Sequence, residues 1–276
     1  MNFTPIKQLF IDDNLRRYRG ISRLLPDFII VGAQKAGTTS LFHYLKQHPQ
    51  IIGSKPNEVH FFDYNFHKGL GYYRSYFPTK TELQLQQNDL RKTVITGETS
   101  PSYLFFSFVP QRIAKTLPNI KIIILLRDPV ARSFSQYHHE VRKGRETESF
   151  EAAITREETG ETSNRYQSGE YSSHQYGCKS YLARGRYIEG IKAYFSLFKP
   201  EQILILSSED FFSKPQKVYD SILKFLNLEP FVITDVKAKN VGNYSKKAIP
   251  LEHKLRKYFQ PYNQELYSFL ERDFNW

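Results

Sequence analysis

The stretch FIIVGAQKAGTTSLFHYLKQ, residues 28–47, constrains the fold of this chain more than any other. A short apolar run leads into a loop with Gly32 and Gly37, and apolar residues then recur at helical spacing until Pro49. A glycine-rich turn between a buried strand and a helix presents backbone N–H groups at the positive end of the helix dipole. The stretch therefore predicts an α/β unit that binds a phosphate or sulfate group at its turn.

Further units of the same kind follow along the chain. Short apolar runs at residues 94–97, 121–126 and 203–206 predict buried strands. The segments expected to be helical are a helix that opens at Pro110 and residues 130–142, 187–198 and 216–226. Buried strands that alternate with helices predict an α/β fold with a central parallel sheet flanked by helices.

We expect one domain over residues 26–276, after a polar and basic lead-in at residues 1–25. Residues 142–180 are polar and contain four glycines, which predicts either a mobile flap over a site or a solvated insertion. Two helices rich in Tyr and Phe are expected at the end of the chain.

The composition limits the classes of binding partner and the cellular compartments that the chain fits. The net charge of +11 favours anionic partners. Cys178 is the single cysteine, and we find no signal-peptide pattern and no apolar run of bilayer length. These features predict a cytoplasmic protein without a membrane segment. A non-catalytic polyanion binder would also suit the charge, but the basic residues are spread along the chain, so nucleic acid is not the expected partner.

The loop departs from the nucleoside-triphosphate pattern G-x-x-x-x-G-K-[ST]. Gly32 and Gly37 have its spacing, but Thr38 follows the second glycine and the lysine lies inside the loop at Lys35. The displaced lysine weakens the alternative of a P-loop-type nucleotide kinase.

A second anion site is predicted in LLRDPVARSFSQY, residues 125–137. Arg127 directly follows an apolar strand, Asp128 and Pro129 begin a helix, and Ser135 lies a little over two helical turns further on. A guanidinium at a strand end and a serine on the next helix can converge on one anion.

These two segments carry a family resemblance. GAQKAGTTSL resembles the 5′-phosphosulfate loop of sulfotransferases that use 3′-phosphoadenosine 5′-phosphosulfate (PAPS), and LLRDPVARSFSQY is similar to their 3′-phosphate element. The motifs lie closest to the heparan sulfate and glycan type, over residues 26–276. The resemblance implies a P-loop-like sulfotransferase fold, a PAPS donor and no metal. It implies donor contacts from Lys35, Ala36, Gly37, Thr38, Thr39, Ser40, Arg127, Ser135, Arg184, Gly185, Arg186 and Lys246.

The resemblance also implies a carboxylate base. NEVHFFD, residues 57–63, is similar to the segment that holds the catalytic glutamate of the heparan sulfate enzymes, which points to Glu58. His60, two residues away, and Glu98 in GETSPSY remain alternatives. Lys35 is expected to act on the bridging oxygen of the donor. Sulfuryl transfer by such a site would be in-line, to a hydroxyl or an amine.

The acceptor is left open by the sequence. Many glycan sulfotransferases have lysine where this chain has Thr99, which weakens the case for a glycosaminoglycan. A saccharide and a small-molecule metabolite are therefore both kept as acceptors, and the oligomeric state is not predicted.

Overall fold

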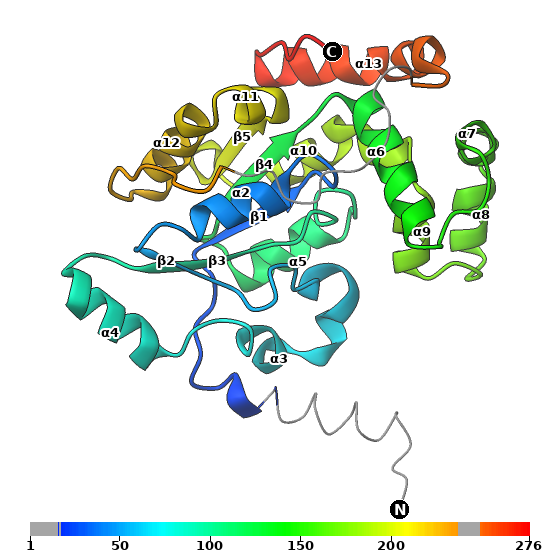
Figure 1. The fold of residues 1–276 in the computed structure, drawn as a ribbon. Helices are drawn as coiled ribbons and strands as arrows, with labels where there is room; N and C mark the ends of the chain where they lie inside the picture. The colour runs from blue at the N-terminus through cyan, green and yellow to red at the C-terminus, as the bar shows by residue number, and fades with distance from the viewer. Residues whose placement is uncertain (1–15, 17, 237–248) are drawn as a thin grey trace, which may run out of the picture.

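The computed structural model describes residues 16, 18–236 and 249–276. Its centre is one five-stranded, all-parallel sheet in the order β2-β3-β1-β4-β5 (Figure 1). The strands are β1 (Phe28–Gly32), β2 (Ile51–Gly53), β3 (Ile95–Thr99), β4 (Lys121–Leu126) and β5 (Ile203–Ser207). The predicted parallel sheet is thus confirmed. The short edge strand β2 was not expected, because three residues give too short a pattern to read.

Helices cover both faces of the sheet. The helix α2 (Thr38–Leu45) follows β1, α5 (Val109–Thr116) joins β3 to β4, and α10 (Tyr187–Phe195) precedes β5. The chain leaves β1 towards β2 on one side but leaves β3 and β4 towards the other side. Because crossovers between parallel strands are right-handed, α2 lies on one face and α5 and α10 on the opposite face (Figure 1).

The strands β1 and β4 form the buried centre of the sheet. All five residues of β1 are buried, as are the last five of β4. Strands covered on both faces show unbroken apolar runs, which explains why these two were the clearest in the sequence. The remaining helices are α3 (Leu70–Arg74), α4 (Lys80–Leu90), α6 (Pro129–Arg142), α7 (Phe150–Glu158), α8 (Glu161–Gln167), α9 (Ser173–Lys179), α11 (Ser208–Ser213), α12 (Pro215–Leu226) and α13 (Glu252–Leu270).

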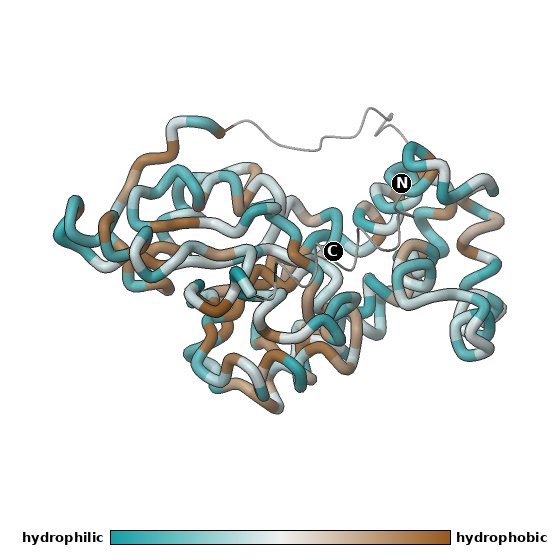
Figure 2. Tube along the Cα trace, turned by 90° about the horizontal axis from the view of Figure 1, so that it is seen from below, coloured by the Kyte–Doolittle hydropathy of each residue, from teal (hydrophilic) through white to brown (hydrophobic). Residues whose placement is uncertain are grey.

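The polar segment at residues 142–180 forms three helices, α7, α8 and α9. They lie together to one side of the sheet (Figure 1), and hydrophilic and hydrophobic residues alternate along them (Figure 2). The expectation of two final helices is wrong, because Glu252–Leu270 is a single helix with Pro261 inside it. Its residues Leu255, Phe259 and Leu266 are buried against the fold, and this packing keeps the helix continuous across the proline.

The end of the predicted lead-in packs on the domain. Arg23 forms an antiparallel bridge with Thr79, and the N–H of Leu24 donates to the carbonyl of Pro78 over 3.0 Å. Within the described part of the chain, none of the helices has the length and apolar character needed to cross a bilayer.

The direction of the connections creates a crevice between β1 and β4. Gly32 of β1 is in register with Ile124 of β4, and the N–H of Ala33 donates to the carbonyl of Leu125 over 2.7 Å. The chain then turns towards opposite sides after these two neighbouring strands. In open parallel sheets, ligands bind at such a switch point, outside the carboxyl ends of the strands.

The buried helix faces provide a test of the core. Leu223 of α12 is 2% exposed, whereas Leu85 of α4 is 60% exposed. We expect Leu223→Ala to lower the free energy of unfolding by about 2–5 kcal/mol, because it leaves a cavity in the core. Leu85→Ala, the matched control, should change it by less than about 0.5 kcal/mol. Urea unfolding measures both, and equal effects of the two substitutions would contradict this packing.

Candidate active site

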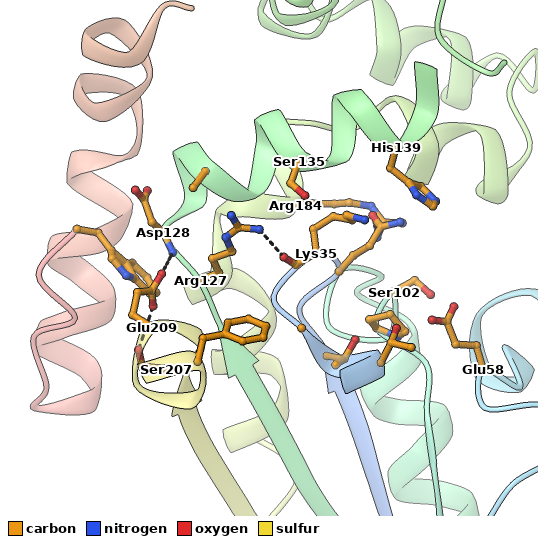
Figure 3. Close-up of a pocket in the computed structure, with 18 of the residues that line it drawn as sticks. Lys35, Glu58, Ser102, Arg127, Asp128, Ser135, His139, Arg184, Ser207 and Glu209 are labelled. Carbon is orange, nitrogen blue, oxygen red and sulfur yellow. Dashed lines mark hydrogen bonds between the residues drawn. The ribbon is translucent and has the colours of Figure 1, made fainter. Parts of the chain in front are cut away.

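A cavity of about 1450 Å³ opens at the carboxyl edge of the sheet, at the crevice between β1 and β4. Its walls come from the loops after β1 and β4, the start of α2, the helix α6, and the tail that follows α13. Figure 3 shows Glu58 and Ser102 on one side of Lys35, with Asp128 and Glu209 on the other side beyond Arg127. The predicted site residues that line this cavity are Lys35, Gly37, Thr38, Thr39, Glu58, His60, Arg127, Ser135 and Arg184.

The loop after β1 is held in a shape that depends on glycine. Gly37 has a φ of 105°, and a Cβ at this position would lie 2.7 Å from Cζ of Phe212. The hydroxyl of Ser208 donates to the carbonyl of Ala36 over 2.7 Å. Gly37 is also the N-cap of α2 and offers no side chain to cap the helix. The N-terminus of α2, with Thr38 and Thr39 in its first turn, therefore opens on the cavity.

The two predicted anion anchors touch each other. Nη1 of Arg127 donates to the carbonyl of Lys35 over 2.9 Å, and the hydroxyl of Tyr187 donates to the carbonyl of Arg127 over 2.8 Å. Asp128 caps α6 by accepting from the N–H of Val130, as the predicted helix start requires. Ser135 then points from α6 towards Arg127 and Arg184 (Figure 3).

Arg184 is a nearly buried cation in the cavity wall. It is 7% exposed, its Nη1 donates to Oε1 of Gln34 over 2.9 Å, and its guanidinium lies 4.8 Å from the ring centre of Phe105. Its Nε is buried and has no hydrogen-bond partner among the described residues. The carboxylate of Glu157 accepts the backbone N–H groups of residues 181–183 over 2.6–2.8 Å and so fixes the turn that carries Arg184.

Positive charge is concentrated around Lys35. The pKa of Lys35 is lowered to about 8, chiefly by burial and in addition by the neighbouring cations Arg142 and Arg127. Cations in close proximity destabilise one another, so this part of the cavity favours an anionic ligand.

Glu58, His60 and Asp63 form a hydrogen-bonded row. Nε2 of His60 lies 3.3 Å from Oε2 of Glu58, and Nδ1 lies 2.8 Å from Oδ2 of Asp63. Burial by itself would lower the pKa of His60, but the hydrogen bonds to Asp63 and Glu58 outweigh it and raise the pKa to about 10. His60 is therefore a cation at neutral pH. Asp63 was not identified from the sequence, although it stands in the quoted string NEVHFFD.

Glu98 does not line the cavity. Its side chain is fully buried and accepts hydrogen bonds from the hydroxyls of Tyr73 and Ser100, each over 2.7 Å. Burial raises the pKa of Glu98 to about 7, although these hydrogen bonds act in the opposite direction. The hydroxyl of Ser100 also accepts a hydrogen bond from the N–H of His60 over 3.0 Å. Glu98 therefore contacts the row of Glu58, His60 and Asp63 indirectly, through Ser100.

The remaining predicted residues lie outside the cavity lining. Ala36 and Ser40 are buried behind it, Gly185 packs against Phe259, and Arg186 pairs with Glu189 over 2.8 Å. Lys246 falls outside the described residues. The lining residues that sequence reasoning did not identify include Gln34, Tyr64, Ser102, His139, Arg142, Lys143, Arg145, His174, Phe212 and, from the tail, Arg272, Phe274 and Trp276.

Comparison with known proteins identifies related chains. The family described as "Sulfotransferase domain" matches residues 25–260. The membrane-associated sulfotransferase kil1 of Dictyostelium discoideum is 29% identical over 320 residues, which cover 91% of this chain and 66% of the relative. Heparan sulfate glucosamine 3-O-sulfotransferase 3A1 of Mus musculus is 29% identical over 282 residues, which cover 92% of this chain and 65% of the relative. The chain thus spans just under two thirds of the length of these relatives.

A solved structure agrees with the fold. The sulfotransferase from Alicyclobacillus acidocaldarius superimposes with a TM-score of 0.70 at 30% identity, and the match covers 91% of this chain and 97% of that one. The likeness therefore extends over most of the fold.

The charge of His60 can be tested by replacing its carboxylate partner. In Asp63→Asn we expect the pKa of His60 to fall from about 10 towards its ordinary value, because the hydrogen bond and the charge that raise it are lost. NMR titration of the imidazole measures this, and His138, whose pKa is lowered by burial alone, serves as the internal control.

The raised pKa of His60 also predicts how the free energy of unfolding depends on pH. The pKa of His60 is about 10 in the folded state and about 6.5 in the unfolded state. Protonated His60 therefore stabilises the fold fully below about pH 6.5, and this contribution is lost as the pH rises towards 10. The advantage of the wild type over Asp63→Asn in urea unfolding should therefore shrink between about pH 6.5 and pH 10. A wild-type His60 that titrates below pH 7 would contradict the assignment.

Proposed function

The chain belongs to the sulfotransferase domain family, and on that premise we propose that its cavity binds PAPS and transfers the sulfuryl group to a hydroxyl or amine of an acceptor. The observation that carries the proposal is the contact between Nη1 of Arg127 and the carbonyl of Lys35, over 2.9 Å. It joins the two anion anchors into one surface that can hold both charged ends of a single nucleotide.

The residues of the cavity fit a ligand with several negative charges. The pKa of Lys35 is lowered in part by two neighbouring arginines, and an anion would reverse that effect. Arg184 carries a buried Nε without a partner in the described structure. We assign the phosphosulfate end to the loop and the first turn of α2, and the opposite phosphate to Arg127 and Ser135, with Arg184 beside them.

We give the predicted donor residues outside the cavity supporting roles. Ala36, Ser40 and Gly185 shape the backbone behind the cavity, and Arg186 anchors the turn of Arg184 to α13 through the hydroxyl of Tyr258 at 3.2 Å. The role of Lys246 stays a prediction, as does the cytoplasmic location.

When bound, the donor would supply an activated sulfuryl group. Glu58 is then the base, because its carboxylate is 41% exposed in the cavity and can accept the proton of the acceptor hydroxyl. His60 is protonated at neutral pH, so it cannot take up that proton and instead holds Glu58 in place. Glu98 is buried away from the cavity. Lys35 stabilises the negative charge that develops on the phosphate side of the reacting bond.

An anionic saccharide is the acceptor class that we favour. Arg142 and Lys143 line the cavity on exposed positions, and within the described residues neither of them forms an ion pair. Arg145, in contrast, is neutralised by Glu140 over 2.6 Å. Two unneutralised cations attract an acceptor that carries carboxylate or sulfate groups. The relative named for heparan sulfate glucosamine acts on such a chain, and a small anionic metabolite is the second candidate.

The alternatives explain fewer of these features. A nucleotide kinase would need the lysine after Gly37, where this chain has Thr38. A polyanion binder would need no carboxylate in the cavity, whereas Glu58 and Asp63 are both connected to His60.

Donor binding and chemistry can be separated by two substitutions. Arg127→Ala should weaken binding of 3′-phosphoadenosine 5′-phosphate by about 100-fold, because a hydrogen bond to a charged partner contributes about 1.5–3 kcal/mol. Glu58→Gln should keep this binding and lower kcat by about 100-fold or more, because the proton acceptor is lost. Calorimetry without magnesium measures the first effect, and transfer of labelled sulfate measures the second.

Matched controls are available on the surface. Arg165→Ala on α8 and Glu265→Gln on α13 remove the same charges outside the cavity, and we expect both to leave binding and turnover unchanged. A fully active Glu58→Gln enzyme would remove Glu58 from the mechanism. Failure of the wild type to bind the bisphosphate would overturn the proposed function.

The acceptor class can be tested on the cavity rim. Lys143→Ala should raise KM for a sulfated or carboxylated oligosaccharide several-fold, with kcat and donor affinity nearly unchanged, because it removes only acceptor attraction. Arg142→Ala should raise this KM in the same way and should also alter donor affinity, because Arg142 acts on the charge of Lys35. A neutral oligosaccharide is the control acceptor. If KM for both acceptors changed equally, the charge-based selection of the acceptor would be wrong.

A further inference from the structure

The helix α6 lines the cavity along one of its faces. Its lining residues Ala131, Ser135, His139 and Arg142 follow one another at spacings of four, four and three residues. Side chains at these spacings lie on the same face of an α-helix, about one turn apart. Because the helix rises by about 1.5 Å per residue, His139 lies about 6 Å beyond Ser135 along its axis. The face thus runs from the part of the cavity at Arg127 to the rim at Arg142.

His139 occupies the middle of this face. Figure 3 shows its ring on the side of Lys35 on which Glu58 and Ser102 also lie. Ser135, one turn earlier, points instead towards the part that we assign to the opposite phosphate of the donor. In the proposed function the sulfuryl group lies between Lys35 and Glu58. His139 is therefore the residue of α6 that stands beside the reacting bond.

The imidazole of His139 is neutral, and its proton has a fixed position. The pKa of His139 is lowered chiefly by burial and in addition by the nearby charge of Lys35. The cations Arg142 and Arg145 act in the same direction, whereas Glu140 acts against them. Nη2 of Arg142 lies 3.2 Å from Nδ1 of His139. A guanidinium can only donate, so Nδ1 accepts this hydrogen bond and the proton is assigned to Nε2.

The Nε2–H of His139 is available to a ligand. His139 is half-buried and lines the cavity, and Nε2 has no hydrogen-bond partner in the part of the chain that the structure describes. Lys35 and Arg142 attract an anion through their charge, whereas a neutral N–H donates to one particular oxygen atom. The bond to Arg142 also restrains the ring, so the direction of this donor is set before a ligand binds.

We propose that the Nε2–H of His139 donates a hydrogen bond to a non-bridging oxygen of the sulfuryl group while that group is transferred. This inference rests on the proposed function, because it assigns a further contact to the same reaction. In that step the acceptor atom bonds to sulfur as the bond from sulfur to the bridging oxygen breaks. The electron pair of the broken bond stays with the phosphate beside Lys35, and the acceptor proton passes to Glu58. His139 therefore neither gains nor loses a proton.

Two other roles for His139 agree less well with its surroundings. As the base, it would become a cation beside Lys35 and Arg142, which burial and both charges disfavour. As a contact to the opposite phosphate, it would have to reach back one helical turn to the position of Ser135. A neutral donor to the group in transfer meets neither difficulty.

Nucleotides with and without the sulfuryl group test this assignment. PAPS carries the group and 3′-phosphoadenosine 5′-phosphate lacks it, so calorimetry with both ligands on the full chain isolates the contacts to it. In His139→Ala we expect affinity for PAPS to fall about 2- to 10-fold, with affinity for the bisphosphate unchanged. Transfer of labelled sulfate should fall about 100-fold, because a donor aimed at the reacting group acts most strongly in the transition state. The rate is measured with a sulfated oligosaccharide and, without it, with water as the acceptor.

Further variants separate the hydrogen bond from packing. His139→Gln keeps an N–H donor on a side chain of similar reach, so it should restore most of the rate and of the PAPS affinity. His139→Leu fills the space without a donor and should behave like His139→Ala. His253→Ala on α13, at an exposed histidine outside the cavity lining, is the matched control and should change neither the affinities nor the rate.

Each outcome decides the question. Selective loss of PAPS affinity and of rate, both restored by glutamine, supports the inference. Equal loss of affinity for both nucleotides would assign His139 to the phosphates, and a raised KM for the oligosaccharide with an unchanged rate to water would assign it to the acceptor. A loss that glutamine did not restore would assign it to packing, and wild-type values throughout would remove it from the site. Each of these four results overturns the inference, whereas a wild type that bound neither nucleotide would overturn the proposed function itself.

Discussion

The site depends on one constraint, which is that the carboxyl ends of β1 and β4 are neighbours in a parallel sheet. The register places Gly32 beside Ile124, and three residues beyond each of these positions Lys35 and Arg127 meet through a hydrogen bond of 2.9 Å. Because the chain leaves the two strands towards opposite sides, nothing fills the crevice between them. The cavity and the proposed donor anchors both follow from this arrangement.

Electrostatics divides the cavity into two functional halves. Burial and the neighbouring cations Arg142 and Arg127 disfavour the positive charge of Lys35, so this half is suited to an anion. Around His60 the neighbouring charges are negative instead, because the carboxylates of Asp63 and Glu58 lie on either side of the positive imidazole. A histidine in this state can orient a carboxylate but cannot accept a proton. The proposed proton transfer is therefore assigned to Glu58, the carboxylate of this row that lines the cavity.

The elements that build the two halves differ in kind. The proposed donor side is formed by strand ends and by short helices tied to them, such as α11 through the hydrogen bond from Ser208 to the carbonyl of Ala36. The proposed acceptor side includes the end of α6 and two residues of α9, His174 and Cys178, in a segment that lies away from the sheet (Figure 1). A donor common to a family can be held by the sheet, while an outlying segment can vary with the acceptor. The half-buried Glu157 joins the two parts, because it lies on α7 and accepts the backbone N–H groups of the turn that carries Arg184.

The sequence by itself determined the parallel sheet, the glycine-rich loop and the positions of Lys35, Arg127 and Ser135, because each of these is set by a local pattern of strand, turn and helix. The tertiary structure decided the rest, because those features depend on contacts between distant residues. The charge of His60 comes from Asp63 and Glu58 together with burial, and the exclusion of Glu98 comes from its burial beneath Tyr73 and Ser100. Phe212 and the tail at Trp276 become lining residues only when α11 and the chain end pack against the loop and the sheet edge. No local pattern encodes such proximity, since these residues lie far from the loop along the chain.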